Sequence, residues 1–256
     1  MILSQLAVQL YTLRDFLHTA EDIKITAKKV RAIGYSAVEI AGFGPLSPAE
    51  FREILDGEGL AIAGIHASTE AILETPEKVV EDLDILGVTH ASYPYPAGID
   101  FTSQASIEKL AAQLDASGAI LHQSGKTLAY HNHANEFLRH GAGTVLDFIY
   151  ASCRSEHLQA ELDTYWVQYG GANPVAWIEK LAGRLPLLHL KDYAFQSSNQ
   201  PIMAEVGAGN LDFPAIISAA RKSGVKWYIV EQDVTPGDPF DSIKQSFDFI
   251  QANLLD

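Results

Sequence analysis

Three short apolar segments of the chain end in side chains of types that bind metal ions. Asp163, His189 and Glu231 stand at these ends, where a run of leucine, isoleucine or valine gives way to polar residues. Burying ionisable groups beside apolar segments costs free energy unless they are paired with one another or with an ion. Oxygen and imidazole ligands suit Mn2+, Mg2+, Co2+ or Zn2+, and the sequence does not choose among these ions. The pattern predicts a divalent-metal site; a network of structural salt bridges is the alternative.

Further polar side chains stand at equivalent positions, at the ends of apolar segments or in the residues that follow them. His133 is two residues from His131, so both imidazoles can point to the same side of an extended chain. Trp166 is three residues after Asp163 and suits either the wall of a ligand pocket or packing between barrel and loop. His66 fits a substrate contact or a hydrogen-bonded core histidine. The whole set comprises Gln9, Glu39, His66, Tyr93, His131, His133, Glu136 and Lys191.

The elements that must position these side chains follow a repeated pattern. A helical stretch ends at a glycine, and a short apolar strand follows a few residues later. Helix starts are indicated by Ser47, Thr75, Asn173 and Asp212, each shortly before a proline. The expected strands are Leu6–Leu10, Ala37–Ile40, Ala61–Ile65, His90–Tyr93, Thr127–Tyr130, Leu158–Leu162, Leu187–Leu190 and Trp227–Val230, and the expected glycines are Gly34, Gly59, Gly87, Gly125 and Gly224.

Eight apolar strands that alternate with helices predict a (β/α)8 TIM barrel, an α/β fold of parallel strands with helical crossovers. The 256 residues suit one such barrel, so we expect a single domain over residues 1–256. An open doubly wound sheet would give similar local patterns. In a barrel, the active site lies at the carboxyl ends of the strands, where the polar residues above stand. The longest irregular connection, Phe195 to Asp212, is predicted to be a loop over the site.

Composition excludes several classes of function. The formal net charge of −14 disfavours nucleic acid as a partner. No apolar run approaches the ~20 residues that span a bilayer, and no basic lead-in of a signal peptide is present, so a cytoplasmic protein without a membrane partner is expected. Cys153 is the only cysteine, which excludes an internal disulfide and favours a packing role for its thiol. The oligomeric state stays open, with a homo-oligomer among the options.

Several motifs together resemble the xylose isomerase-like barrel family, which includes sugar phosphate isomerases and epimerases. The resemblance covers nearly the whole chain. Its motifs are Val8-Gln9-Leu10-Tyr11-Thr12-Leu13-Arg14, Tyr130-His131-Asn132-His133 with Glu136-Phe137, Leu162-Asp163-Thr164-Tyr165-Trp166, His189-Leu190-Lys191-Asp192, Glu205 to Asp212, and Val230-Glu231.

The resemblance implies a small-molecule sugar substrate and a divalent metal ion bound by residues of strands five to eight. These ligands would be Glu136, Asp163, His189 and Glu231, with the two glutamates on opposite sides of the sugar. Ketose epimerases of this kind have a glutamate within strand five, whereas this chain has His131 there. His131 or His133 is therefore the alternative to Glu136. Those epimerases also have an arginine where this chain has Phe195.

The chemistry implied is removal of a carbon-bound proton beside a carbonyl, which gives an enediolate stabilised by the ion. Glu231 is the expected base and Glu136 the residue that returns the proton. Lys191, held by Asp192, would neutralise a developing oxyanion. His133 is a further catalytic candidate. Substrate contacts are expected from Gln9, Glu39, His66, His131 and Trp166.

Three other functions remain open. A lyase or dehydratase acting on a 3-keto-glycoside or related keto sugar would use the same intermediate and expel a neighbouring substituent. A metallophosphodiesterase would need more histidine and aspartate ligands than these positions supply. A barrel that only binds a sugar is the non-enzymatic alternative, since fold alone proves no function.

Overall fold

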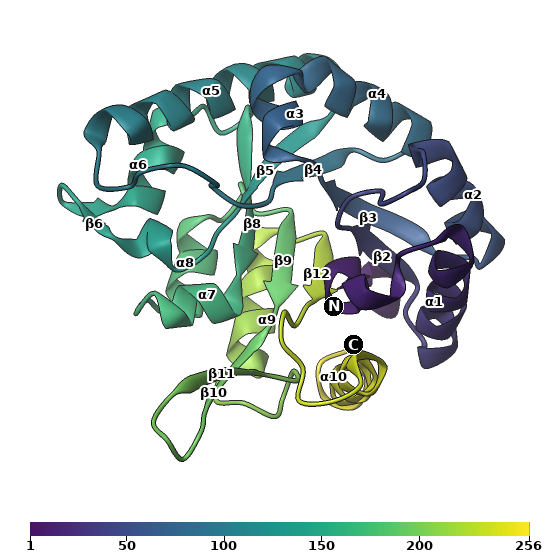
Figure 1. Cartoon of the computed structure of the whole chain (residues 1–256). Coiled ribbons are helices and arrows are strands. Elements are labelled where there is room, and N and C mark those ends of the chain that lie inside the picture. Colours follow the sequence, from purple (N-terminus) through teal and green to yellow (C-terminus); the bar gives the residue numbers. More distant parts are fainter. Residues whose placement is uncertain (256) are drawn as a thin grey trace.

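The structure is a computed structural model that describes residues 1–255. Within these residues, eight parallel strands close into a barrel in the order β1-β12-β9-β8-β5-β4-β3-β2, which confirms the predicted TIM barrel (Figure 1). Each predicted strand is present, and its ends differ from the prediction by no more than one residue. The barrel strands are β1 (Leu6–Gln9), β2 (Ala37–Ile40), β3 (Ala61–His66), β4 (His90–Tyr93), β5 (Thr127–His131), β8 (Leu158–Asp163), β9 (Leu187–Leu190) and β12 (Trp227–Val230).

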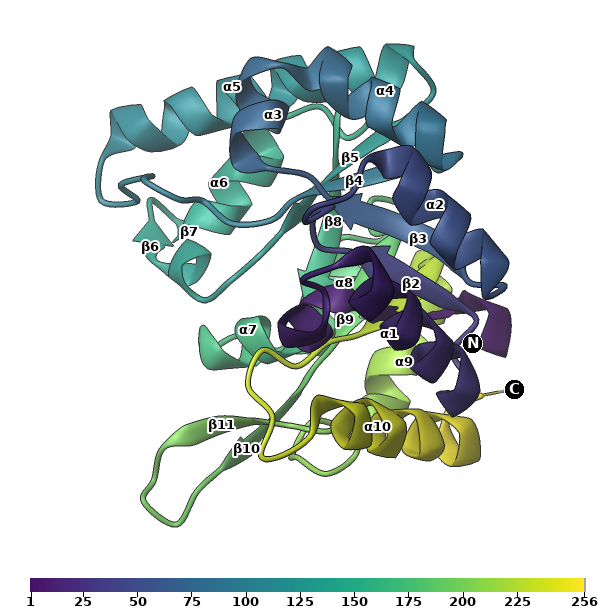
Figure 2. The same ribbon diagram turned by 45° about the vertical axis from the view of Figure 1, so that its right-hand side comes forward.

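Helices surround the barrel, as the ribbon shows (Figures 1 and 2). They begin and end with the predicted chemistry at most positions: Ser47, Asn173 and Asp212 accept hydrogen bonds from N–H groups of the following first turn, whereas Thr75 makes no such bond. The helices are α1 (Ala20–Ile33), α2 (Pro48–Gly57), α3 (Thr69–Glu74), α4 (Pro76–Leu86), α5 (Gln104–Gln123), α6 (Val145–Ser152), α7 (Thr164–Tyr169), α8 (Pro174–Lys180), α9 (Phe213–Ser223) and α10 (Pro239–Asn253), with 3-10 turns at Leu3–Gln5, Leu10–Phe16 and Asn135–Phe137.

The interior of the barrel is filled in layers. The lower layer is apolar and consists of small or branched side chains from six strands, namely Ala7, Ala37, Ala63, Ala129, Leu187 and Ile229. Because side chains of a strand alternate between its faces, the residues two positions later along most of these strands also point inward, one layer nearer the carboxyl ends. Those residues are Gln9, Glu39, His131, His189 and Glu231, and all are buried. The alternation therefore places a layer of polar side chains directly above the apolar layer.

Gly64 of β3 makes room for this polar layer. The register between β2 and β3 shifts by one residue at Val38 and Glu39, which brings Gly64 opposite Glu39. A Cβ atom at Gly64 would lie 3.1 Å from the carbonyl oxygen of His90 and 3.3 Å from Oε1 of Glu39. The absence of a side chain here lets the Glu39 carboxylate occupy the barrel interior.

The connection after β9 differs from the predicted loop. Its first part is an antiparallel hairpin of β10 (Asp192–Phe195) and β11 (Pro201–Ala204), which stands away from the barrel in both views (Figures 1 and 2). The remainder is fixed by Asp192, whose carboxylate accepts hydrogen bonds from the N–H groups of Gly207, Gly209 and Leu211. A second small hairpin pairs β6 (Arg139–His140) with β7 (Gly143–Thr144).

Two predictions about the chain outside the barrel interior can be compared with the structure. Cys153 is buried at the end of α6, and burial raises the pKa of its thiol to about 12, in keeping with a packing role. None of the helices in residues 1–255 has the length and apolar character needed to cross a membrane.

Candidate metal and substrate site

His189 lies at the centre of the polar layer and contacts carboxylates with both ring nitrogens. Its Nε2 atom is 2.7 Å from Oε2 of Glu39, and its Nδ1 atom is 2.9 Å from Oε2 of Glu231. Burial lowers the pKa of His189, but the carboxylates of Glu161, Glu231 and Glu39 outweigh burial and hold it well above its usual value. The ring is thus fixed in orientation by a carboxylate of another strand, β2, and by one that directly follows β12.

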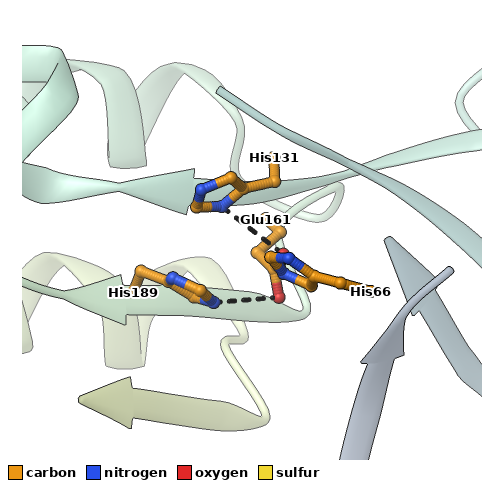
Figure 3. A group of neighbouring side chains, drawn as sticks. All are labelled: His66, His131, Glu161 and His189. Atoms are coloured by element: carbon orange, nitrogen blue, oxygen red, sulfur yellow. Dashed lines mark hydrogen bonds and ion pairs between the residues drawn. The ribbon is translucent and has the colours of Figure 1, made fainter. Parts of the chain in front are cut away.

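Glu161 is a member of the layer that the sequence analysis did not select. Its Oε2 atom is 2.7 Å from Nε2 of His66 and 3.5 Å from Nδ1 of His131, and its Oε1 atom is 3.3 Å from Nε2 of His189 (Figure 3). Burial raises the pKa of Glu161, yet His189 and His66 hold it well below its usual value. Glu161 is two residues before Asp163, so alternation along β8 is the signal that could have identified it.

Two groups of side chains offer ligand atoms close enough together to hold an ion. One consists of His66, His131, Glu161 and His189, and the other of His131, Asp163, His189 and Glu231; the ligand atoms of each lie within 4.8 Å of one another. Ligands at about 2.0–2.2 Å on opposite sides of an ion are separated by roughly 4.4 Å, so the spacing suits a bound cation. The second group unites the three predicted ligands Asp163, His189 and Glu231 with His131.

His131 suits the role of a neutral ligand. Burial, together with the neighbouring His189 and His133, lowers its pKa well below the usual value, which leaves an uncharged imidazole. Its Nδ1 atom is buried and makes no hydrogen bond within the described residues; the nearest charged atom is Oε2 of Glu161, at 3.5 Å. Buried polar atoms without a hydrogen-bond partner are uncommon, so this one favours an additional species beside the ring.

Glu136 is not brought together with the other predicted ligands. It lies in the 3-10 turn after β5, where its carboxylate accepts hydrogen bonds from the hydroxyl of Tyr130, at 3.0 Å, and from the N–H group of His133, at 2.9 Å. Tyr130 alternates with the inward-pointing Ala129 and His131, so it faces the surrounding helices. Glu136 therefore lies behind the barrel wall, and neither candidate ligand group of the described residues contains it.

Lys191 lies beside the second ligand group. Its Nζ atom is 2.7 Å from Glu231, 3.0 Å from Asp163 and 3.1 Å from Asp233. The side chain is 1% exposed, and these carboxylates outweigh burial and raise its pKa. The expected partner Asp192 is turned away, because successive residues of an extended chain point to opposite sides. Asp233, which the sequence analysis did not select, takes its place.

Gln9 and Glu39 contact each other instead of the open cavity. Nε2 of Gln9 donates to Oε2 of Glu39 at 2.8 Å, and Oε1 of Gln9 accepts from the N–H group of Tyr11. Both side chains are fully buried. Burial and the nearby Glu161 raise the pKa of Glu39 to about 7, although His66 and His189 oppose the shift. Their position suits support of His189 better than contact with substrate.

A cavity of about 670 Å3 opens over the polar layer. His66, His131, His133, Glu231 and Asp233 reach it, so it connects the candidate ion site with the solvent. Burial and the nearby Lys191 lower the pKa of His133 to about 3, so this imidazole is uncharged. Trp166 packs against His133 with ring centroids 5.3 Å apart, and its ring lies 5.6 Å from Nζ of Lys191.

The chain belongs to the xylose isomerase-like TIM barrel family, because the model of this family matches residues 27–253. Solved structures share the fold. A sugar phosphate isomerase/epimerase from Parabacteroides distasonis is 22% identical, with 99% of this chain and 96% of that chain covered and a TM-score of 0.83. An L-ribulose 3-epimerase is 15% identical, with 98% of this chain and 94% of that chain covered and a TM-score of 0.77.

A protein from Bacillus anthracis named as a 3-DHS dehydratase also has this fold, at 15% identity, with 96% of this chain and 98% of that chain covered and a TM-score of 0.74. No match is found among curated proteins. At these identities the solved structures establish the shared barrel, and the chemistry has to be argued from the site itself.

Proposed function

We propose that the protein is a divalent-metal-dependent isomerase or epimerase of a sugar or sugar derivative. The observation that carries the proposal is the convergence of His131, Asp163, His189 and Glu231 at the carboxyl ends of four barrel strands, next to a cavity of about 670 Å3. Sugar isomerases and epimerases among the proteins of the same fold support it. In this proposal, His131 replaces Glu136 in the ligand set that the sequence predicted.

The four ligands carry two carboxylates and two imidazoles, a set that suits Mn2+, Co2+, Zn2+ or Mg2+. A bound ion of this kind supplies Lewis-acid stabilisation of adjacent sugar oxygens and fixes their position. His189 is the best oriented of the ligands, since Glu39 and Glu161 hold its Nε2 side. Carboxylates that hold the second nitrogen of a metal-binding histidine are a common feature of such sites.

Glu231 is the proposed base. It lines the cavity, and Lys191 and His189 outweigh burial and hold its pKa well below the usual value, so the carboxylate is ionised at neutral pH. It would take the proton from the carbon beside the carbonyl and leave an enediolate. Lys191, which contacts Glu231, would place a positive charge near the oxygen that becomes negative.

Return of the proton decides between the two reactions. Delivery to the neighbouring carbon by the same base gives isomerisation, and delivery to the opposite face gives epimerisation. Asp233 also lines the cavity, and burial and Glu231 raise its pKa to about 6, which suits a group that donates and accepts protons near neutral pH. We propose Asp233 or His66 as the second proton carrier, since Glu136 is turned away from the cavity.

The decisive experiment is solvent deuterium exchange into a panel of ketoses and aldoses in D2O. Wild-type protein loaded with Mn2+ should introduce deuterium into an intact sugar, and Glu231→Gln should abolish the exchange. Glu136→Gln is the matched control, because it removes the other glutamate that the sequence predicted as a ligand, which does not line the cavity. The proposal fails if chelator-treated protein binds none of the four metals, or if Glu231→Gln exchanges at the wild-type rate.

Elimination is the second candidate. Apart from Glu231, Asp233 and two tyrosines, the ionisable side chains that line the cavity among the described residues are imidazoles, where the sequence predicted a second glutamate. Burial lowers the pKa of His66, but Glu161 and Glu39 outweigh it and raise this pKa, so His66 can protonate a departing oxygen. The Bacillus anthracis protein named as a 3-DHS dehydratase supports elimination as the second candidate. Release of an aglycone or of water from a 3-keto-glycoside, without deuterium in recovered substrate, would favour this reaction.

A further inference from the structure

The cavity is larger than the sugar that the proposed chemistry needs. A hexose has about twelve heavy atoms, and allowing each the roughly 30 Å3 that liquid water occupies gives at most ~360 Å3. The cavity volume is about 670 Å3. A hexose at the ion site would therefore leave close to half of the cavity unfilled.

The unfilled half lies over the first four strands. Glu231 and His131 reach the inner end, whereas the residues that follow β1 to β4 form the remainder, among them Tyr11, Gly42, Ala67 and Tyr95. Tyr11 is 44% exposed and Tyr95 is 51% exposed, so part of each ring is open to a ligand in the cavity. Tyrosine combines a rigid apolar face with a hydroxyl, which suits the C–H face and the hydroxyls of a sugar ring.

Both tyrosines are held in place by neighbouring side chains. The guanidinium of Arg14 lies 4.6 Å from the ring centroid of Tyr11 and donates hydrogen bonds to the carbonyl oxygens of Tyr11 and Asp233. The ring of Tyr95 packs edge-on against His133, with centroids 4.9 Å apart. Fixed aromatic faces bind ligands with little loss of side-chain entropy.

The charges around the cavity disfavour a phosphate group. Its lining within the described residues contains no lysine or arginine, and its two carboxylates, Glu231 and Asp233, would repel a phosphate. Lys191 is already paired with Asp163, Glu231 and Asp233. Arg14 is engaged by backbone carbonyls and lines a neighbouring pocket instead. Phosphate sites commonly use a free lysine or arginine side chain, which the described lining does not offer.

We propose that the substrate is an unphosphorylated ketose that carries a second sugar ring, and that Tyr11 and Tyr95 bind this second ring. The inference rests on the proposed sugar chemistry at the inner end of the cavity. It names a substrate class that differs from a sugar phosphate, and it assigns a binding role to two tyrosines outside the ion site.

Three ligands that differ at one oxygen test the proposal. D-Fructose, isomaltulose and D-fructose 6-phosphate carry a hydrogen, a glucosyl ring and a phosphate on the same O6 atom. Turanose, lactulose and leucrose place the second ring on O3, O4 and O5 of fructose, respectively. Dissociation constants of Mn2+-loaded protein are measured for all six by calorimetry, and deuterium incorporation is followed for each.

We expect at least one disaccharide to bind about tenfold or more tightly than fructose, and fructose 6-phosphate to bind no more tightly than fructose. Tyr11→Ala and Tyr95→Ala should each weaken binding of that disaccharide by about 3- to 10-fold, in line with loss of one aromatic contact. The dissociation constant of fructose should change by less than about twofold in both variants. Tyr11→Phe and Tyr95→Phe retain the aromatic ring, so these variants should still bind the disaccharide more tightly than fructose. Tyr169→Ala is the control, because Tyr169 is 48% exposed and does not line the cavity.

The inference is overturned if no disaccharide binds more tightly than fructose, if fructose 6-phosphate binds more tightly than every disaccharide, or if the tyrosine variants weaken fructose equally. The outcomes for the proposed function are separate. Deuterium entry into fructose or its phosphate without preference for a disaccharide keeps the isomerase or epimerase function and rejects the second ring. If disaccharide binding depends on the tyrosines but deuterium enters none of the sugars, the binding site for the second ring is kept and the isomerase or epimerase function is rejected.

Discussion

The Nζ atom of Lys191 lies 2.7 Å from Oε2 of Glu231, and the same ammonium is 3.0 Å from Oδ2 of Asp163. Asp233 is a third carboxylate in contact with this ammonium, at 3.1 Å, but Glu231 and Asp163 also belong to the four residues proposed to bind the metal ion. The Lys191 ammonium and a bound metal ion would therefore be attracted by the same two carboxylates. The two positive charges would repel each other strongly, because Lys191, Glu231 and Asp163 are all buried and little water screens them.

Removal of this ammonium should strengthen metal binding while weakening catalysis. We expect Lys191→Met to bind Mn2+ about tenfold or more tightly than wild type, since a competing positive charge is removed from two ligands. Deuterium exchange should fall about 100- to 1,000-fold, the usual cost of losing one oxyanion-stabilising group. Calorimetric titration of Mn2+ gives the affinity and NMR gives the exchange rate. Unchanged or weaker Mn2+ binding would contradict the arrangement described.

Metal affinity should also depend on Glu39, which is buried beneath His189 and has no access to the cavity. Glu39→Gln removes the charged partner of His189 Nε2 at 2.7 Å. The expected loss is about 10- to 100-fold in Mn2+ affinity, as found when such supporting carboxylates are replaced. Glu53→Gln on the exposed side of α2 is the control and should bind Mn2+ as wild type does. Equal affinities for the Glu39 variant and wild type would rule out this supporting role.

The barrel was predictable from the sequence because its signals are local. Gly87 and Gly224 end α4 and α9 with positive φ values of 71° and 85°, and the apolar segments that follow become β4 and β12. Alternation along a strand also explains why Asp163, His189 and Glu231 meet: Asp163 ends β8, His189 is the penultimate residue of β9, and Glu231 directly follows β12. These signals can be recognised from residues that are close together in the sequence, without information on contacts between distant segments.

The predictions that depended on distant contacts were less successful. The direction of Glu136 is set by its hydrogen bond to Tyr130, six residues earlier and on the outward face of β5. The partner of Lys191 is Asp233, forty-two residues later, and not the adjacent Asp192. The hairpin of β10 and β11 arises from pairing between segments that lack strong alternation. Loop geometry and long-range ion pairs are fixed by the assembled barrel, so one strand-like pattern at a time does not specify them.

Gly64 offers a test of the packing around Glu39. Gly64→Ala would place a Cβ atom 3.1 Å from the carbonyl oxygen of His90 and 3.3 Å from Glu39, and backbone on one side prevents relief by a simple rotation. We expect the free energy of unfolding to fall by about 1–3 kcal/mol, the usual cost of overpacking, together with weaker Mn2+ binding. Gly57→Ala, where nothing lies within 4 Å, is the matched control and should be neutral or slightly stabilising.

Glu136 should act on stability through its pKa. Burial raises this pKa to about 7, whereas a glutamate of the unfolded chain titrates near its ordinary value of 4.5. Between these values the folded protein binds more protons than the unfolded chain, so the free energy of unfolding falls as pH rises from about 4.5 to about 7. The shift corresponds to about 3 kcal/mol. Stability contributed by the protonated carboxyl is thus present at low pH and is lost as pH passes the folded pKa.

Glutamine at position 136 resembles the protonated carboxyl and removes this proton linkage. Urea unfolding at several pH values should therefore show that Glu136→Gln gains stability relative to wild type as pH rises from about 5 to 8, by an amount of the order of 1–3 kcal/mol. Mn2+ stoichiometry should stay at the wild-type value, because the carboxylate is hydrogen-bonded to Tyr130 and His133 outside the candidate ligand groups. A variant that loses Mn2+ binding would restore Glu136 as a ligand, and a difference in stability that does not vary with pH would show that its carboxyl titrates normally.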